Sequence, residues 1–121
     1  MKIAVAQQNY HIGNFSANVQ KIIHGITEAR SKGADLVLFS ELSICGYPPR
    51  DFLEFDDFID KCRAALDQIK VHTTDIAVLV GAPDRNPDPK GKDLFNAAFF
   101  LFEGEVRDVV YKTCLPTYDV F

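Results

Sequence analysis

The stretch ADLVLFSELSICGYPPRD, residues 34–51, decides the fold, because an apolar run passes directly into a polar loop. The run from Ala34 to Phe39 predicts a buried strand. Pro48 and Pro49 exclude a helix through the loop that follows. Glu41 therefore lies where a hydrophobic strand ends, at the rim of the core. Catalytic side chains of α/β proteins are commonly found at such positions.

The segment YKTCLPTYDVF, residues 111–121, carries a second signal. Lys112 follows an apolar, strand-like run and offers a cation at the end of another strand. A carboxylate and an ammonium group at two strand ends form the skeleton of a catalytic site. The pattern predicts that Glu41 and Lys112 come within bonding distance and face a shared hollow.

The first third of the chain has a strand–helix–strand pattern. Residues 2–7 predict a strand, and apolar residues then recur at helical spacing over 15–29. Asn14 or Ser16 can cap the start of this helix, and Gly33 can end it. The strand over 34–39 follows at once, so the two strands are predicted to be parallel.

The rest of the chain predicts one more helix and three strands. Helical spacing recurs over 55–69, whereas 75–81 is apolar on both faces, as in a central strand. Residues 82–93 are rich in proline and charge and predict an exposed loop. The remaining predicted elements are strands over 94–102 and 105–111, joined by a turn at 103–104. The fold class is therefore α/β, and we found no linker to a second domain.

Composition limits the classes of function. The chain has 121 residues, enough for one domain, and a net charge of -4, which argues against nucleic-acid binding. No stretch approaches the ~20 apolar residues needed to cross a bilayer, so no membrane partner is expected. Three cysteines without C-x-x-C spacing and three histidines without a ligand pattern predict neither a disulfide framework nor a metal site. Cysteine usage favours a cytoplasmic location.

The last residues, Val120 and Phe121, are apolar. Domains more often end on polar, frayed residues, so we expect this chain to be cut from a longer one. A cut sheet would expose an unpaired edge and an apolar face. We therefore expect self-association into a homo-oligomer.

Each candidate site residue has a plain structural alternative. Glu41, partly desolvated and shielded by Tyr47, would suit a general base, but it could also cap its loop or form a salt bridge. Lys112 could stabilise an oxyanion or be a solvated strand-end lysine. Tyr47 and Tyr118 could wall a pocket for a small polar substrate or simply pack their loops. Cys45, in a tight turn, and Cys62, on the apolar face of the second helix, are interpreted as structural.

Four segments together resemble the carbon–nitrogen hydrolase (nitrilase) superfamily. Within it, they are most similar to the N-terminal glutaminase domain of glutamine-dependent NAD synthetases. The resemblance covers the whole chain. The segments are KIAVAQ (2–7), GADLVLFSEL (33–42), CGYPPRD (45–51) and KTCLPTYDVF (112–121).

This resemblance implies that residues 1–121 are the first part of a four-layer αββα sandwich with a Glu-Lys-Cys triad. Glu41 would match the general base and Lys112 the intermediate-stabilising lysine, with no metal. Tyr47, Tyr118 and Phe121 would fall on the loops that shape the glutamine pocket. The family's nucleophilic cysteine lies well beyond the lysine, so Cys114 does not match it, and the 121-residue chain alone should be inactive.

The resemblance also implies partners. Glutamine would be the substrate, and its ammonia would pass to a synthetase domain of the same polypeptide that uses ATP and magnesium. No cofactor is expected in residues 1–121 themselves. Two alternatives stay open: another amidase of the nitrilase superfamily, and a non-catalytic α/β binding module.

Overall fold

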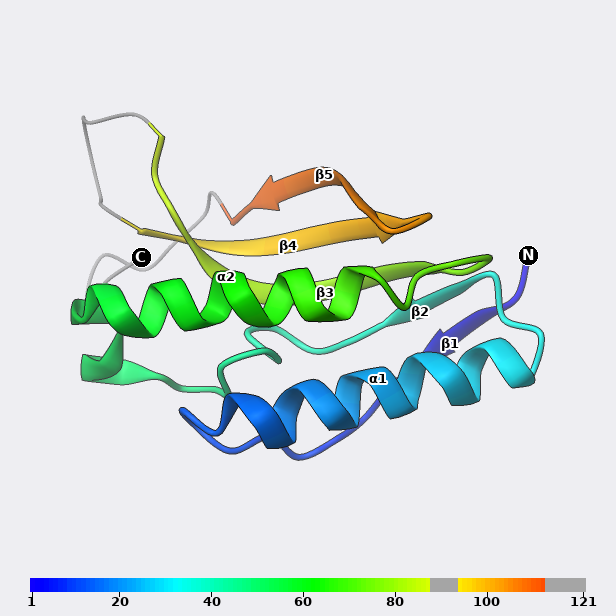
Figure 1. The fold of residues 1–121 in the computed structure, drawn as a ribbon, viewed down its shortest axis with the longest axis horizontal. Helices are drawn as coiled ribbons and strands as arrows, with labels where there is room; N and C mark the ends of the chain where they lie inside the picture. Colours follow the sequence, from blue (N-terminus) through cyan, green and yellow to red (C-terminus); the bar gives the residue numbers. More distant parts are fainter. Residues whose placement is uncertain (88–93, 113–121) are drawn as a thin grey trace.

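A computed structural model describes residues 1–87 and 94–112. These residues form a five-stranded sheet in the order β1-β2-β3-β4-β5, accompanied by helices (Figure 1). The elements are β1 (Ile3–Val5), α1 (Phe15–Ser31), β2 (Leu36–Leu38), the 3-10 helix η1 (Arg50–Glu54), α2 (Asp56–Lys70), β3 (Ala77–Arg85), β4 (Leu94–Phe102) and β5 (Glu105–Tyr111).

Helix α1 begins and ends at the residues that the sequence indicates. The side chain of Asn14 caps its first turn, accepting a hydrogen bond from a backbone N–H at 3.2 Å. At the other end, Gly33 adopts a φ of +78° and donates to the carbonyl of Arg30, while Ala34 donates to the carbonyl of Ala29. These two bonds make a Schellman motif, which closes the helix. Because the N–H of Ala34 is used there, β2 starts later than predicted.

The strand–helix–strand prediction is confirmed. β1 pairs with β2, and β2 with β3, both in parallel, with Ala4, Val37 and Val78 in one cross-strand row. β3 lies at the centre of the sheet, as its apolar sequence predicted. The β4–β5 hairpin also has the predicted bounds, with its turn at residues 103–104.

The predicted exposed loop over 82–93 is wrong for its first four residues, because β3 continues to Arg85. This extension pairs with β4, and Pro83 lies opposite Asn96. β2 accompanies β3 only as far as Leu79, so the extension has one side free of strand pairing. A proline, which has no N–H to donate, is tolerated at such an edge position.

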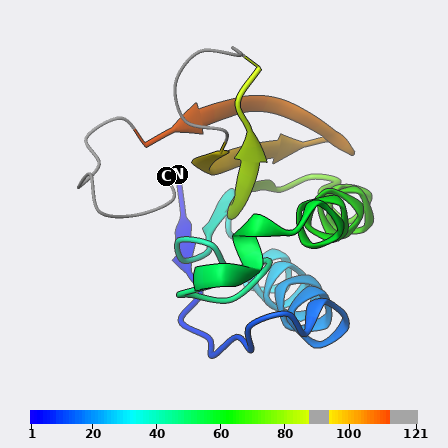
Figure 2. The same ribbon diagram turned by 90° about the vertical axis from the view of Figure 1, so that its left-hand side faces the viewer.

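Both helices lie on the same side of the sheet, as Figure 2 shows end-on. Their apolar stripes pack onto the facing side chains of the central strands, and each fully buried aliphatic side chain contributes about 2 kcal/mol by leaving water. In the described ranges, neither helix is long and apolar enough to span a membrane. The innermost residues are Ile22, Ile26, Leu66, Ile69, Val78, Val80, Phe99 and Leu101.

No described helix or strand covers the opposite face of the sheet. Ile3 and Val5 on β1 are 52% and 66% exposed. Val5 shares its cross-strand row with Leu38 and Leu79, so this face is apolar where three strands meet. The described part of the chain thus has the uncovered apolar face expected from the sequence. Self-association through it remains a prediction.

Asn18 ties the start of α1 to two other segments. Its side chain is completely buried, accepts from the N–H of His11 and donates to the carbonyls of His11 and Ile44. Ile44 belongs to the loop that carries Glu41. This one amide therefore joins the loop before α1 to the loop after β2.

We expect Asn18→Leu to lower the free energy of unfolding by about 2–4 kcal/mol, since it leaves the buried carbonyl of Ile44 and the backbone N–H of His11 without their hydrogen-bond partner. Asn14→Ala, which removes only the exposed helix cap, should cost about 1 kcal/mol. Urea unfolding of both variants checks this. Equal losses for the two variants would contradict the role given to Asn18.

Candidate functional site

The loop after β2 holds Glu41 by folding back on itself. The N–H of Ser43 bonds to the carbonyl of Ser40 at 3.2 Å, and that of Gly46 bonds to the carbonyl of Leu42 at 2.9 Å. Leu42 adopts a φ of +52°, an uncommon conformation for a non-glycine residue. Its side chain is completely buried, and this burial offsets the backbone strain.

The same loop lies directly against β3 at Gly81. A Cβ added at Gly81 would lie 2.5 Å from the backbone nitrogen of Leu42 and 3.2 Å from the carbonyl carbon of Glu41. Gly81 also accepts from the N–H of Ile44 at 3.1 Å and donates to Ser43 Oγ at 3.3 Å. Only a glycine allows this close approach, which fixes the backbone of Glu41 relative to the sheet.

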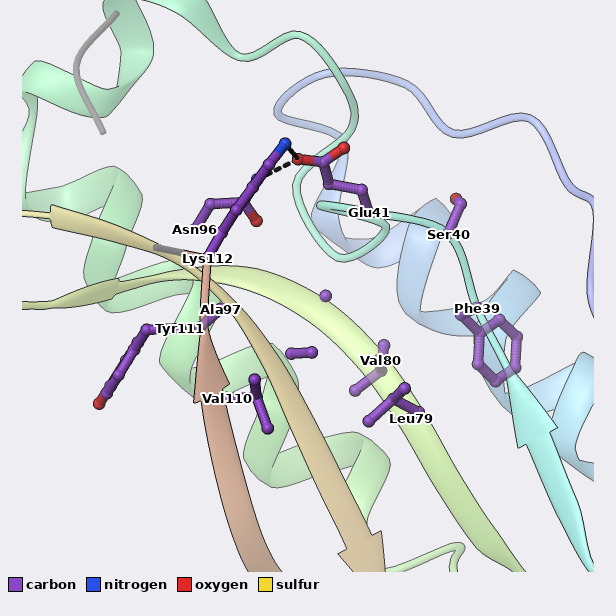
Figure 3. A pocket seen from close by; sticks show the side chains of 12 residues that line it. Phe39, Ser40, Glu41, Leu79, Val80, Asn96, Ala97, Val110, Tyr111 and Lys112 are labelled. Carbon is purple, nitrogen blue, oxygen red and sulfur yellow. Dashed lines mark hydrogen bonds and ion pairs between the residues drawn. The ribbon is translucent and has the colours of Figure 1, made fainter. Parts of the chain in front are cut away.

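Lys112 reaches Glu41 from the end of β5. Its ammonium nitrogen Nζ lies 3.1 Å from Glu41 Oε1, in hydrogen-bond and ion-pair contact (Figure 3). Its backbone N–H donates to the carbonyl of Asn96 at 3.0 Å, so the strand ladder extends to the site. The structure therefore confirms the predicted juxtaposition of positions 41 and 112.

The ion pair remains accessible to solvent. The side chain of Glu41 is 43% exposed and that of Lys112 is 49% exposed. The Tyr47 side chain, predicted to shield Glu41, is 65% exposed and does not line the hollow around the pair. Tyr118, Phe121 and Cys114 lie outside the described residues.

A third residue, Asn96, joins the pair, and the sequence did not single it out. Asn96 lies on β4, is buried, and donates from Nδ2 to Glu41 Oε1, the oxygen that Lys112 also contacts. Figure 3 shows the amide and the ammonium converging on one carboxylate. The signal that could have found it is a single polar residue in the apolar run Leu94–Phe102.

The three residues border a hollow of about 300 Å³, within the usual size range of small-molecule pockets. A carboxylate that can take a proton and a cation that can stabilise an oxyanion thus meet beside a space for a small substrate. Within residues 1–87 and 94–112, no group of three potential metal-ligating side chains is found. The hollow's lining residues are Phe39, Ser40, Glu41, Leu79, Val80, Gly81, Asn96, Ala97, Ala98, Val110, Tyr111 and Lys112.

The phenol of Tyr111 points away from Glu41 (Figure 3). Its hydroxyl donates to Asp84 Oδ2 at 3.2 Å, and its ring packs on Phe95. Burial raises the pKa of Tyr111, and the nearby Asp84 carboxylate raises it further, against the opposing effect of Arg63. Tyr111 therefore stays neutral and secures the end of β5 from the helix side.

Neither described cysteine is suited to nucleophilic attack. Cys45 and Cys62 are both buried free thiols. A hydrogen bond with Cys45 raises the pKa of the Cys62 thiol, and burial raises it further. A thiol held neutral in the core is a poor nucleophile, which supports the structural interpretation of Cys62. The complete burial of Cys45 supports the same interpretation of that residue.

The sequence profile of the carbon-nitrogen hydrolase family matches residues 2–117. This chain belongs to that family. Among curated relatives, glutamine-dependent NAD(+) synthetases from Synechocystis and Xylella fastidiosa are 38% and 37% identical over 98% and 100% of the chain. The chain spans only 22% of the length of each.

Solved structures give the same family and fold. A glutamine-dependent NAD(+) synthetase from Cytophaga hutchinsonii matches 95% of this chain, and 19% of its own, with a TM-score of 0.86 at 26% identity. The glutamine-dependent NAD(+) synthetase from Acinetobacter baumannii, solved with ADP, matches 98% of this chain and 22% of its own chain, with a TM-score of 0.78 at 36% identity. An amidase from Nesterenkonia matches 96% of this chain and 44% of its own chain, with a TM-score of 0.77 at 26% identity. The predicted α/β, nitrilase-type fold is thereby confirmed.

We expect Gly81→Ala to lower the free energy of unfolding by about 1–3 kcal/mol, because its Cβ would meet backbone that cannot yield without moving Glu41. Gly25→Ala is the matched control. The three atoms nearest to its Cβ would belong to the side chains of Phe39 and Gln8, at 3.0–3.2 Å. Alanine also favours the helix there, so the free energy of unfolding of this variant should stay within about 1 kcal/mol of the parent value. Denaturant unfolding tests both, and a harmless Gly81→Ala would refute the close approach.

Proposed function

We propose that Glu41 and Lys112 belong to a glutamine-hydrolysing site that supplies ammonia for NAD synthesis. The observation that carries the proposal is the 3.1 Å contact between Lys112 Nζ and Glu41 Oε1 beside an open hollow. The family match limits the chemistry to carbon–nitrogen bonds. The synthetase relatives, named as glutamine-dependent, support glutamine as the amide.

In the proposed first step, Glu41 removes the proton from a cysteine thiol. The thiolate attacks the side-chain amide carbon of glutamine, and the carbonyl oxygen becomes an oxyanion. The Lys112 ammonium stabilises that negative charge. Since Cys45 and Cys62 are buried, the proposal places this cysteine outside the described residues. One solved variant of the Nesterenkonia amidase carries acrylamide added at its active-site cysteine, which supports a cysteine nucleophile.

The second half of the reaction uses the same two side chains. Glu41 returns its proton to the departing nitrogen, so ammonia leaves and a thioester remains. Water then attacks the thioester, and Glu41 accepts a proton from it. Glutamate is released as the carbon–sulfur bond breaks, and Glu41 gives that proton to the departing thiolate, which restores the thiol. The exposed carboxylate of Glu41 can receive this water directly. We place Tyr47, Tyr118 and Phe121 at the glutamine pocket by resemblance alone.

The ammonia would be consumed by a synthetase part of a longer polypeptide. ATP with Mg²⁺ would activate the acid that is amidated there. The adenosine diphosphate in complex with the Acinetobacter baumannii synthetase supports a nucleotide partner for the longer polypeptide. The free thiols of Cys45 and Cys62 fit a reducing, cytoplasmic setting, and a homo-oligomer would cover the apolar face of the sheet.

A nitrilase-type amidase acting on simple amides is the second candidate, favoured by the likeness to the Nesterenkonia amidase. Comparing glutamine with acetamide and acrylamide as substrates of the full-length protein separates the two. Clear preference for glutamine supports the proposed function. Preference for the simple amides supports the second candidate.

The deciding experiment compares two nitrogen sources for NAD formation by the full-length protein. We expect Glu41→Gln to lower glutamine-dependent synthesis at least about 100-fold, because the general base is lost. Lys112→Met should lower it by about 100- to 1000-fold through loss of oxyanion stabilisation. Both should retain synthesis from added ammonium.

Lys61→Met is the matched control, since Lys61 is an exposed lysine paired with Asp57 on α2 and is not among the hollow's lining residues. It should keep both activities. Retention of glutamine-dependent synthesis by Glu41→Gln would overturn the proposal.

A further inference from the structure

We infer that Asn96 is a positioning residue that orients the Glu41 carboxylate, an inference that rests on the proposed function. Asn96 is a polar residue in the apolar strand β4, and only 7% of it is exposed. Burying an amide costs free energy unless it is hydrogen-bonded. Its position therefore needs a reason beyond the packing of the sheet.

Its partner distinguishes Asn96 from Asn18, the other buried asparagine described above. Asn18 bonds to the backbone of two segments and so serves the fold. Asn96 instead donates its side-chain N–H to the carboxylate of Glu41. A buried donor directed at a half-exposed carboxylate limits the rotation of that side chain, which solvent would otherwise leave free.

Asn96 also holds the other member of the pair. Its carbonyl accepts the backbone N–H of Lys112 at 3.0 Å. One residue thus fixes the carboxylate of Glu41 through its side chain and the backbone of Lys112 through its main chain. The distance between the Glu41 carboxylate and the Lys112 ammonium therefore varies less, and misplaced catalytic groups lower the reaction rate strongly.

The arrangement leaves one carboxylate oxygen for chemistry. Asn96 Nδ2 and Lys112 Nζ both approach Oε1, so Oε2 has no donor among the described residues. Oε2 is then the atom that exchanges a proton with the nucleophile and with water. An amide suits this task because it donates without carrying charge. A carboxylate at position 96 would repel Glu41 and compete for Lys112.

The test uses the full-length protein with glutamine as substrate. Asn96→Leu, which keeps the branched shape of the side chain and removes the donor, should lower kcat about 10- to 100-fold with KM changed less than about threefold. Synthesis from added ammonium should be unchanged. Phe100→Leu, on the same face of β4 but outside the hollow's lining residues, is the control and should leave kcat intact.

Asn96→Asp supplies a readout that a merely structural role would not move. Two adjacent carboxylates retain a proton to higher pH. The acid limb of the plot of kcat/KM against pH should therefore shift to higher pH by about one unit in this variant. In Phe100→Leu the limb should not shift. An unchanged kcat in Asn96→Leu, or an unmoved profile in Asn96→Asp, would overturn the inference.

A thermal-unfolding cycle separates this inference from the proposed function. The changes in melting temperature caused by Asn96→Leu and Glu41→Leu should not add in the double variant, because the two side chains share one interaction. Absence of glutamine hydrolysis in the parent protein would defeat the proposed function alone. Strict additivity of the cycle would defeat the pairing of Asn96 with Glu41.

Discussion

The close passage of the loop after β2 over Gly81 is the constraint on which the site depends. With Leu42 N only 2.5 Å from where a side chain would begin, the loop rests on β3 backbone rather than on side chains. The buried Leu42 and the Asn18 amide hold the same loop from its other sides. Glu41 is thereby anchored to the centre of the sheet, although its own side chain is half exposed.

The ion pair itself contributes little to this anchoring. Exposed pairs are worth up to about 1 kcal/mol, and both partners here are more than two-fifths exposed. The pair therefore follows from the fold rather than stabilising it. The parallel strands deliver Glu41, and the β4–β5 hairpin delivers Lys112, so a mixed sheet brings together residues 71 positions apart. Such a pair is available for chemistry because folding does not depend on it.

Much of this arrangement could be predicted from the sequence, and the reasons differ by element. Helical spacing and the Asn14 and Gly33 signals defined α1, because these signals are local. Proximity of Glu41 and Lys112 could be inferred because both follow apolar strands. The extension of β3 through Pro83 could not, since tolerance of proline depends on where the neighbouring strand ends. Asn96 was missed because one polar residue in a strand does not reveal its partner 55 positions away.

The most direct test is a crystal structure of the full-length protein treated with a diazoketone analogue of glutamine, which alkylates a nucleophilic thiol. We expect one modified cysteine, with the Glu41 carboxylate and the Lys112 ammonium each about 3 Å from the bound analogue or its thioether. A modified cysteine remote from Glu41 and Lys112, or a fully occupied analogue that neither residue contacts, would contradict this expectation.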